Sequence, residues 1–171
     1  MLIELTKLKG LSVGVMDESK KGGEISQIIF DFSQSKVIGF LVKTGGFFSS
    51  EKVVSLPDVV SIDRDGAVIN TSDDILEKDE IVRVDTILKK NAKLVGLRAY
   101  DRAGVLLGFV YDGVFETDTG DLTRLYVGRL WKKYIFSRNR IFDLNEKKVV
   151  IDTDSKIKDS VKPVLGVAEV V

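Results

Sequence analysis

Short apolar runs, separated by polar turns, make up most of this chain. The run Glu24–Phe32 is rich in β-branched and aromatic residues and lacks the 3.6-residue period of an amphipathic helix. Val37–Val42 is apolar on both faces of the strand that it predicts, which is typical of a closed or covered sheet. Clusters of Gly, Asp and Ser between the runs indicate turns. The pattern therefore predicts a mainly β protein.

The stretch Gly23–Val42 occurs twice, because a shift of 85 residues places it on Gly108–Val127. Three pairs of positions are identical in the two copies: Gly23/Gly108, Phe30/Phe115 and Val42/Val127. Just upstream, the motif Leu8-x-Gly10-Leu11 recurs at a shift of 86 residues as Leu94-x-Gly96-Leu97. The chain is therefore a tandem repeat in which one loop has changed length.

Beyond the matched stretch, the two copies predict the same order of elements. In the first copy, the turn Asp63–Gly66 separates strands at Val59–Ile62 and Ala67–Asn70. Val42 to Asp63 spans 21 positions and Val127 to Asp143 spans 16, so the second copy is five residues shorter. The deletion falls on the loop Gly45–Ser50. The second copy closes with Lys148–Ile151 and Thr153–Ile157, and residues 158–171 could add a last strand or lie across the other barrel.

The connection between the copies contains no Pro or Gly and keeps apolar periodicity, so we expect it to be ordered and packed. The sequence predicts a strand at Leu2–Leu5, a capping box formed by Asp74 and Glu77, a strand at Glu80–Val84, and one or two helical turns from Asp85 to about Asn91. We divide the chain into repeat 1 at residues 1–78, a short helical connector at 79–93, and repeat 2 at 94–171.

Each copy thus holds Leu-x-Gly-Leu, a Gly turn, a long strand ending Phe-Asp or Phe-Glu, and a strand containing Phe-Leu-Val or Leu-Tyr-Val. The first copy continues with Ser55–Val59 and Ile62-Asp63. This order resembles the PRC-barrel family over most of residues 7–157. The resemblance implies two small six-stranded barrels, which we expect to be related by a pseudo-twofold axis and packed as one body.

The resemblance also implies a docking role and no shared active site. One such barrel belongs to the H subunit of the photosynthetic reaction centre, and a related barrel forms the C-terminal half of a ribosome maturation factor that binds a ribosomal protein. The sequence departs from both, since it shows neither a membrane helix nor a separate N-terminal domain. The function of neither protein transfers directly to this chain.

Composition narrows the chemistry further. Cysteine and histidine are absent, which excludes disulfides, thiolate zinc sites, a Cys nucleophile and an imidazole base. We therefore expect that the protein is not an enzyme and that it binds neither a cofactor nor a metal ion. The net charge is zero, but residues 1–85 hold 10 basic and 15 acidic residues whereas residues 86–171 hold 16 and 11. This asymmetry either helps the halves to dock on each other or marks the second half as the one that meets an anionic partner.

Carboxylate pairs that could serve acid–base or metal chemistry stand at Asp63/Asp65, Asp73/Asp74 and Asp152/Asp154. All three lie in predicted turns or caps, so solvated turn residues are the better interpretation, and an enzyme with a carboxylate site is an unfavoured alternative. The longest uncharged apolar run, Ala103–Tyr111, is too short to span a bilayer, and charged residues interrupt the apolar start of the chain. We expect a cytoplasmic protein without membrane insertion.

Leu122–Phe142 interleaves basic and aromatic residues and contains no acidic residue. Such a pattern can bind a phosphate backbone and stack bases, or it can be an ordinary strand pair with core aromatics and solvated basic residues. The first repeat lacks this excess of positive charge in its equivalent stretch. We predict a partner-binding surface in repeat 2, formed by Arg124, Arg129, Trp131, Lys132, Lys133, Arg138 and Arg140.

Phe47-Phe48 lies at a predicted loop tip after Gly45-Gly46. The two rings either anchor a partner, or plug the end of the barrel or the interface between the repeats. The predicted partner is a protein with an acidic surface, and structured RNA such as a ribosomal precursor is the alternative. A homodimer is also compatible with the sequence.

Overall fold

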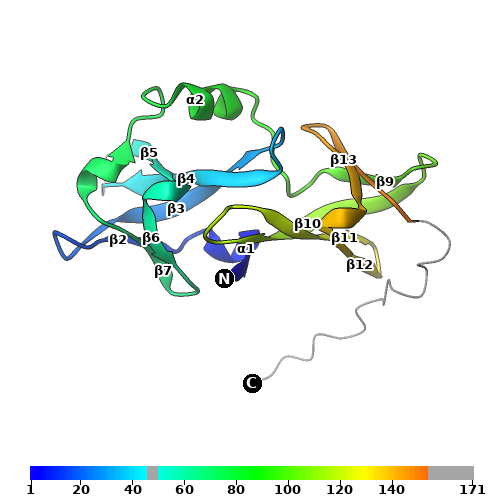
Figure 1. Cartoon of the computed structure of the whole chain (residues 1–171), viewed down its shortest axis with the longest axis horizontal. Coiled ribbons are helices and arrows are strands. Elements are labelled where there is room, and N and C mark those ends of the chain that lie inside the picture. The colour runs from blue at the N-terminus through cyan, green and yellow to red at the C-terminus, as the bar shows by residue number, and fades with distance from the viewer. Residues whose placement is uncertain (46–49, 154–171) are drawn as a thin grey trace, which may run out of the picture. The chain divides into compact units, whose positions relative to one another are not determined.

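The structure is a computed structural model that describes residues 1–45 and 50–153 (Figure 1). The chain divides into two compact units. Unit 1 consists of Met1–Ala92 and Val114–Leu122, and unit 2 of Lys93–Gly113 and Thr123–Val171. The turn at the centre of the second repeat therefore belongs to unit 1.

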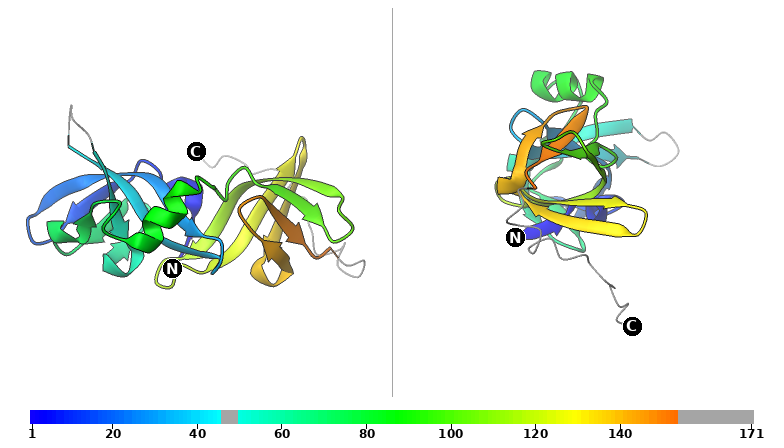
Figure 2. Two further views of the ribbon diagram at one scale, coloured as in Figure 1. Left: turned by 90° about the horizontal axis from the view of Figure 1, so that it is seen from above. Right: turned by 90° about the vertical axis from the view of Figure 1, so that its right-hand side faces the viewer.

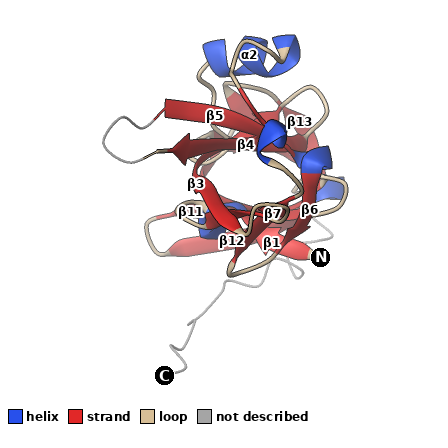
Figure 3. Cartoon of the chain, turned by 90° about the vertical axis from the view of Figure 1, so that its left-hand side faces the viewer, coloured by secondary structure: helices blue, strands red, loops and turns tan. Residues whose placement is uncertain are grey.

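The sheet of unit 1 is seven-stranded, in the order β6-β7-β2-β3-β4-β5-β8, and it curls as Figure 3 shows. Its strands are β2 (Ser12–Val15), β3 (Lys20–Asp31), β4 (Lys36–Thr44), β5 (Ser50–Ser55), β6 (Val59–Ile62), β7 (Gly66–Ile69) and β8 (Ile75–Leu76). The pair β2–β7 is parallel and the other pairs are antiparallel. Phe40 and Val42 on β4 are fully buried, as expected for a strand that is apolar on both faces.

Short helical segments join these strands. The 3₁₀ turn η1 (Leu56–Asp58) ends β5 at Pro57, and η2 (Ser72–Asp74) follows β7. Thr71 and Asp74 form the capping box of η2, so the short helical turn expected at Thr71–Asp74 is present, but its box is formed by Thr71 and Asp74 and not by Asp74 and Glu77. The N-terminal strand β1 is Leu2–Glu4 and is followed by the helical turn α1 (Leu5–Leu8).

The connector differs from its predicted form. A helix, α2 (Val82–Lys89), begins inside the segment Glu80–Val84, which was wrongly predicted as a strand. The physical reason is tertiary: Val84 is buried in a cluster with Ile29, Leu41 and Val53, so α2 covers one face of the unit 1 sheet (Figure 1). Helical geometry lets Ile81, Ile87 and Leu88 join Val84 on this face.

Unit 2 repeats the topology of unit 1. Its strands are β9 (Arg98–Asp101), β10 (Leu106–Glu116), β11 (Leu122–Arg129), β12 (Lys132–Ser137), β13 (Ile141–Leu144) and β14 (Lys148–Ile151). They follow the order β12-β11-β10-β9-β14-β13, and this sheet is also curled (Figure 2). The parallel pair β9–β14 corresponds to β2–β7, and the 3₁₀ turn η3 (Arg138–Arg140) corresponds to η1. The end of β10, which lies in unit 1, pairs with β1.

Repeated glycines explain why the two copies fold alike. A Cβ atom on Gly23 would lie 2.4 Å from the carbonyl oxygen of Lys43, and one on Gly108 would lie 2.4 Å from that of Gly128. Real Cβ atoms do not approach carbonyl oxygens this closely, so only glycine lets β3 and β10 pass so near to the following strand. The conserved spacing of these glycines therefore fixes the same strand crossing in both copies.

Candidate binding surface

The hairpin β11–β12 carries most of the predicted binding residues. Arg129 pairs with Lys132 in the ladder, so Leu130 and Trp131 alone form the turn. Five residues separate β4 from β5 in the first copy, so the second copy loses three residues at this turn and not the five predicted, because Asp63 is equivalent to Asn145 and not to Asp143. Two-residue hairpin turns usually contain Gly, Asn or Asp, whereas this turn contains two residues with large apolar side chains.

Leu130 and Trp131 are the most exposed large apolar residues that the structure describes, at 88% and 97%. Leu130 also has a φ of +52°, in the left-handed region that costs a residue with a Cβ atom about 1–2 kcal/mol. The exposed side chains gain no burial energy on folding, and the positive φ of Leu130 costs stability. Such a combination is typical of positions kept for binding.

A hollow of about 360 Å³ lies beside this turn. It is lined mainly by apolar and basic side chains: Leu106, Leu107, Arg129, Leu130, Trp131, Lys132 and Tyr134. Tyr134, which lines the hollow, is stacked on the buried Phe136 with ring centroids 6.0 Å apart, so the hollow adjoins the core of unit 2. We call these seven residues the hairpin surface.

The ladder shows which basic residues share a face. Residues paired directly across an antiparallel ladder point to the same side. Leu125 with Phe136 therefore marks the core face, which continues to Arg129 with Lys132 at the turn. Lys133, paired with Gly128, points to the opposite face, where its ammonium lies 5.7 Å from the ring centroid of Tyr111. Arg124, paired with Ser137, shares that opposite face.

Arg138 and Arg140 lie outside this arrangement. They form η3, which begins where β12 ends, a strand length of about 17 Å from the turn. The guanidinium of Arg138 donates to the carbonyl oxygen of Ile141 at 3.3 Å, and Arg140 is half-buried. The structure thus brings Arg129, Trp131 and Lys132 together and does not bring Arg138 and Arg140 to them.

The other predicted sites have structural explanations where the structure describes them. Phe47 and Phe48 lie outside the described residues. One Asp63 carboxylate oxygen accepts from the backbone N–H groups of Asp65 and Gly66, which is a turn contact. Within residues 1–45 and 50–153, no three acidic side chains group closely enough to hold a metal ion.

Asp73 and Asp74 belong to the capped turn η2, where the Asp74 carboxylate accepts from the backbone N–H of Thr71 at 3.1 Å. Asp152 lies 3.4 Å from the guanidinium of Arg102, and its predicted partner Asp154 is outside the described residues. None of these described carboxylates is arranged as an acid–base pair.

Two polar networks in unit 1 escaped the sequence analysis. In the first, the buried Asp31 carboxylate accepts from the N–H and hydroxyl of Ser33 and from the guanidinium of Arg83 on α2. Burial alone would raise the pKa of Asp31, but the hydrogen bonds from Ser33 and Arg83 outweigh it and hold this pKa below its usual range. Asp31 and Arg83 are 52 positions apart in the chain, which explains why no sequence pattern revealed the pair.

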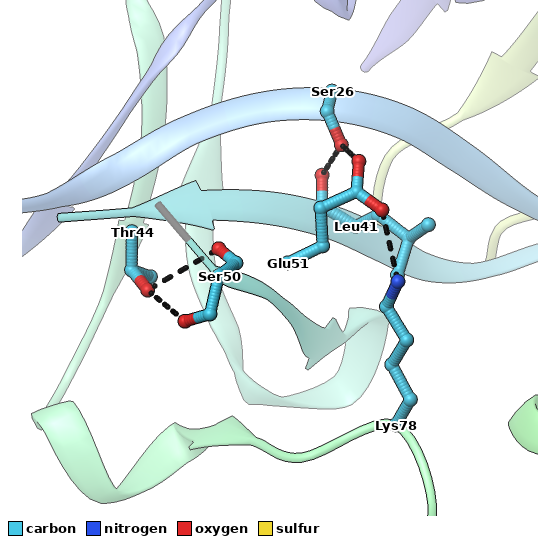
Figure 4. Close-up of polar contacts among 6 residues, drawn as sticks. All are labelled: Ser26, Leu41, Thr44, Ser50, Glu51 and Lys78. Atoms are coloured by element: carbon cyan, nitrogen blue, oxygen red, sulfur yellow. Dashed lines mark hydrogen bonds and ion pairs between the residues drawn. The ribbon is translucent and has the colours of Figure 1, made fainter. Parts of the chain in front are cut away.

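The second network lies on β5 (Figure 4). Glu51 accepts from the ammonium of Lys78 at 2.8 Å and from the hydroxyl of Ser26 at 3.1 Å. The hydrogen bond from Lys78 holds the pKa of Glu51 below its usual range. This network ties the segment before α2 to the sheet.

Comparison with known proteins adds one finding. A model of the PRC-barrel domain matches the chain twice, over residues 1–76 and 89–158. No curated protein matches the chain. The described residues contain no helix with the length and apolar content that crossing a bilayer requires.

Proposed function

The chain belongs to the PRC-barrel domain family, of which it carries two copies, and we propose that it is a non-catalytic docking protein. Its hairpin surface binds an acidic patch on a protein partner. The observation that carries the proposal is the turn Leu130–Trp131, where two large apolar side chains are presented to solvent on a strained backbone between basic residues.

The energetics of this turn favour a binding role. A tryptophan buries roughly 200 Å² in an interface, which at roughly 25 cal/mol per Å² corresponds to roughly 5 kcal/mol before the costs of association. Trp and Arg are also among the residue types enriched at the hot spots of protein interfaces. Trp131 beside Arg129 has this composition, so we assign it the anchoring role.

The charge of the surface defines the partner. Arg129 and Lys132 flank the apolar turn on one face of the hairpin. A partner must therefore offer an apolar depression for Trp131 with carboxylates around it. RNA is the competing ligand, because an exposed indole can also stack on a base. The leucines of the hollow, Leu106 and Leu107, favour a protein side chain over a phosphate.

A non-catalytic role is supported by the lack of histidine and cysteine and by the turn and cap contacts of the carboxylate pairs that the structure describes. We extend the proposal to a cytoplasmic location and to a monomer that associates with a different protein. Cell fractionation tests the location, and sedimentation velocity of the purified chain detects a homodimer.

Affinity capture from the native lysate, with and without nuclease, tests the docking role. The wild-type chain is expected to retain a nuclease-resistant protein that the variants Trp131→Ser and Lys132→Glu do not retain. Val82→Ser is the matched control, since Val82 is an exposed apolar residue on α2. Capture that disappears with nuclease, and weakens steeply with salt, indicates RNA instead. Equal capture by Trp131→Ser and wild type contradicts the proposed surface.

A further inference from the structure

The sheet face that α2 covers in unit 1 has a counterpart in unit 2. Leu41 on β4 pairs with Val53 on β5, and both lie under Val84 of α2. In unit 2 the corresponding pair is Tyr126 on β11 and Ile135 on β12.

The correspondence follows from the neighbouring rungs of the two ladders. The pair Phe40–Val54 faces the core of unit 1, and Leu125–Phe136 faces the core of unit 2. The next rung in each ladder points the opposite way, because side chains alternate along a strand. We call this side of unit 2 the outer face, and it includes Phe109, Tyr111, Tyr126, Lys133 and Ile135.

The two faces differ in exposure. Leu41 and Val53 are 5% and 0% exposed beneath α2, whereas Ile135 is 41%, Phe109 45% and Tyr111 37% exposed. Residues 93–113 and 123–153 contain no α-helix that would cover the outer face as α2 covers its counterpart. Large apolar side chains of unit 2 are thus exposed to solvent on the face that α2 covers in unit 1.

The charge at this position is reversed between the repeats. Glu51 is paired with Lys43 in the ladder of unit 1. Its carboxylate accepts a hydrogen bond from the ammonium of Lys78, which lies four residues before α2 (Figure 4). Lys133 takes the place of Glu51, since it is paired with Gly128 on the equivalent rung. An occupant of the outer face must therefore carry an acidic residue where the unit 1 segment carries Lys78.

We propose that the outer face of unit 2 binds an amphipathic helix of another protein, with an acidic residue just ahead of the helix that pairs with Lys133. The model for this mode is α2 itself, which presents Ile81, Val84 and Leu88 to the equivalent face at helical spacing. The outer face is distinct from the hairpin surface, so this inference does not depend on the proposed role of Trp131.

A matched pair of peptides derived from this chain tests the proposal. One peptide copies residues 76–90, and the other carries Lys78→Glu. Each is added to the ¹⁵N-labelled full chain, binding is mapped by chemical-shift changes, and affinity is measured by anisotropy of a labelled peptide. The Lys78→Glu peptide is expected to perturb Tyr111, Tyr126, Lys133 and Ile135, and to bind about fivefold more tightly than the unchanged peptide.

Charge reversal on the protein supplies the decisive control. In the Lys133→Glu variant the order of the two peptide affinities is expected to invert, while the Trp131→Ser variant binds both peptides as the wild type does. Circular dichroism and thermal unfolding confirm that both variants fold, as exposed positions allow.

Four results overturn the inference. The first is an affinity order that stays the same in Lys133→Glu. The second is perturbation confined to the neighbourhood of Leu41, which means that the peptides only replace α2. The third is no perturbation of the outer face, which is also the result if another part of the chain or a second copy fills it. Loss of binding in Trp131→Ser would instead assign the peptide to the hairpin surface and overturn the outer face as its site.

Discussion

Lys36 and Asp121 face each other across an isolated antiparallel bridge, with the ammonium nitrogen 3.2 Å from a carboxylate oxygen. They are 85 residues apart, which is the shift of the repeat, so the bridge joins equivalent positions of the two copies. Val37 donates its N–H to the carbonyl of Gly120 at 2.8 Å, and Leu122 donates to that of Ser35 at 3.2 Å. These two bonds are themselves equivalent under the same shift, and all of these residues belong to unit 1.

Gly120 is the position on which this bridge depends most. A Cβ atom there would lie 2.1 Å from the carbonyl oxygen of Val37, and φ is +75°. Gly120→Ala is expected to destabilise the protein by about 3 kcal/mol, because it adds overpacking to backbone strain. Gly104→Ala is the control, since Gly104 has a φ of +83° with open space around it, and about 1 kcal/mol is expected. Urea unfolding measures both, and equal losses would contradict the role of the bridge.

Asp31 makes stability depend on pH. Its pKa is lowered in the folded state, so its contribution is complete above the pKa of about 4 of an unfolded aspartate and is lost as pH falls through the folded pKa. Asp31→Asn is expected to cost about 2 kcal/mol at neutral pH and to flatten the stability profile between pH 4 and more acidic values. Chemical unfolding at a series of pH values checks this. An unchanged acid slope in Asp31→Asn would assign the slope to other carboxylates.

The pKa of Asp58 is shifted in the opposite direction to that of Asp31, so its ionisation has the opposite effect on stability. Burial raises its pKa, and the charge of Asp74 raises it further. The folded state therefore holds this proton more tightly than the unfolded state, and ionisation of Asp58 opposes folding as pH rises through its pKa. Asp58→Asn is expected to stabilise the protein slightly at pH 7 and to make no difference in acid. Thermal unfolding at both pH values, with the exposed Asp73→Asn as control, tests the sign.

In the proposed function, Leu130 lowers the stability of the fold and contributes to partner binding. Asn tolerates the left-handed conformation better than Leu and exposes less apolar surface. Leu130→Asn is therefore expected to raise the free energy of unfolding by roughly 0.5 kcal/mol while reducing partner capture. Urea unfolding and affinity capture measure the two effects. A stabilised variant with undiminished capture would leave Leu130 without a binding role.

The sequence alone determined the repeat, the β class and the family resemblance, because these rest on local patterns. The motif Leu-x-Gly-Leu illustrates this. Gly10 donates its N–H to Ile25 at 2.8 Å, and Gly96 donates to Val110 at 2.7 Å. The residues that accept are themselves equivalent at the 85-residue shift, so the motif and the strand after it form one conserved contact.

Elements whose form depends on distant partners were predicted less well. The segment Glu80–Val84 is apolar enough for a strand, and it becomes part of a helix because Val84 packs on Ile29 and Leu41 while Arg83 reaches Asp31. These contacts join residues that are distant in the sequence, so local propensity does not reveal them. The prediction of a short helical connector was nevertheless correct.

The candidate site shows the same division. The sequence located basic and aromatic residues on β11 and β12, but only the ladder decided that Arg129 and Lys132 share a face, that Lys133 points the other way, and that Arg138 lies a strand length from the turn. Composition likewise does not distinguish the buried Phe136 from the exposed Trp131. Burial is a property of the assembled sheet: the same aromatic residue lies in the core or in solvent according to which strand face it occupies and whether that position lies within the ladder or at its turn.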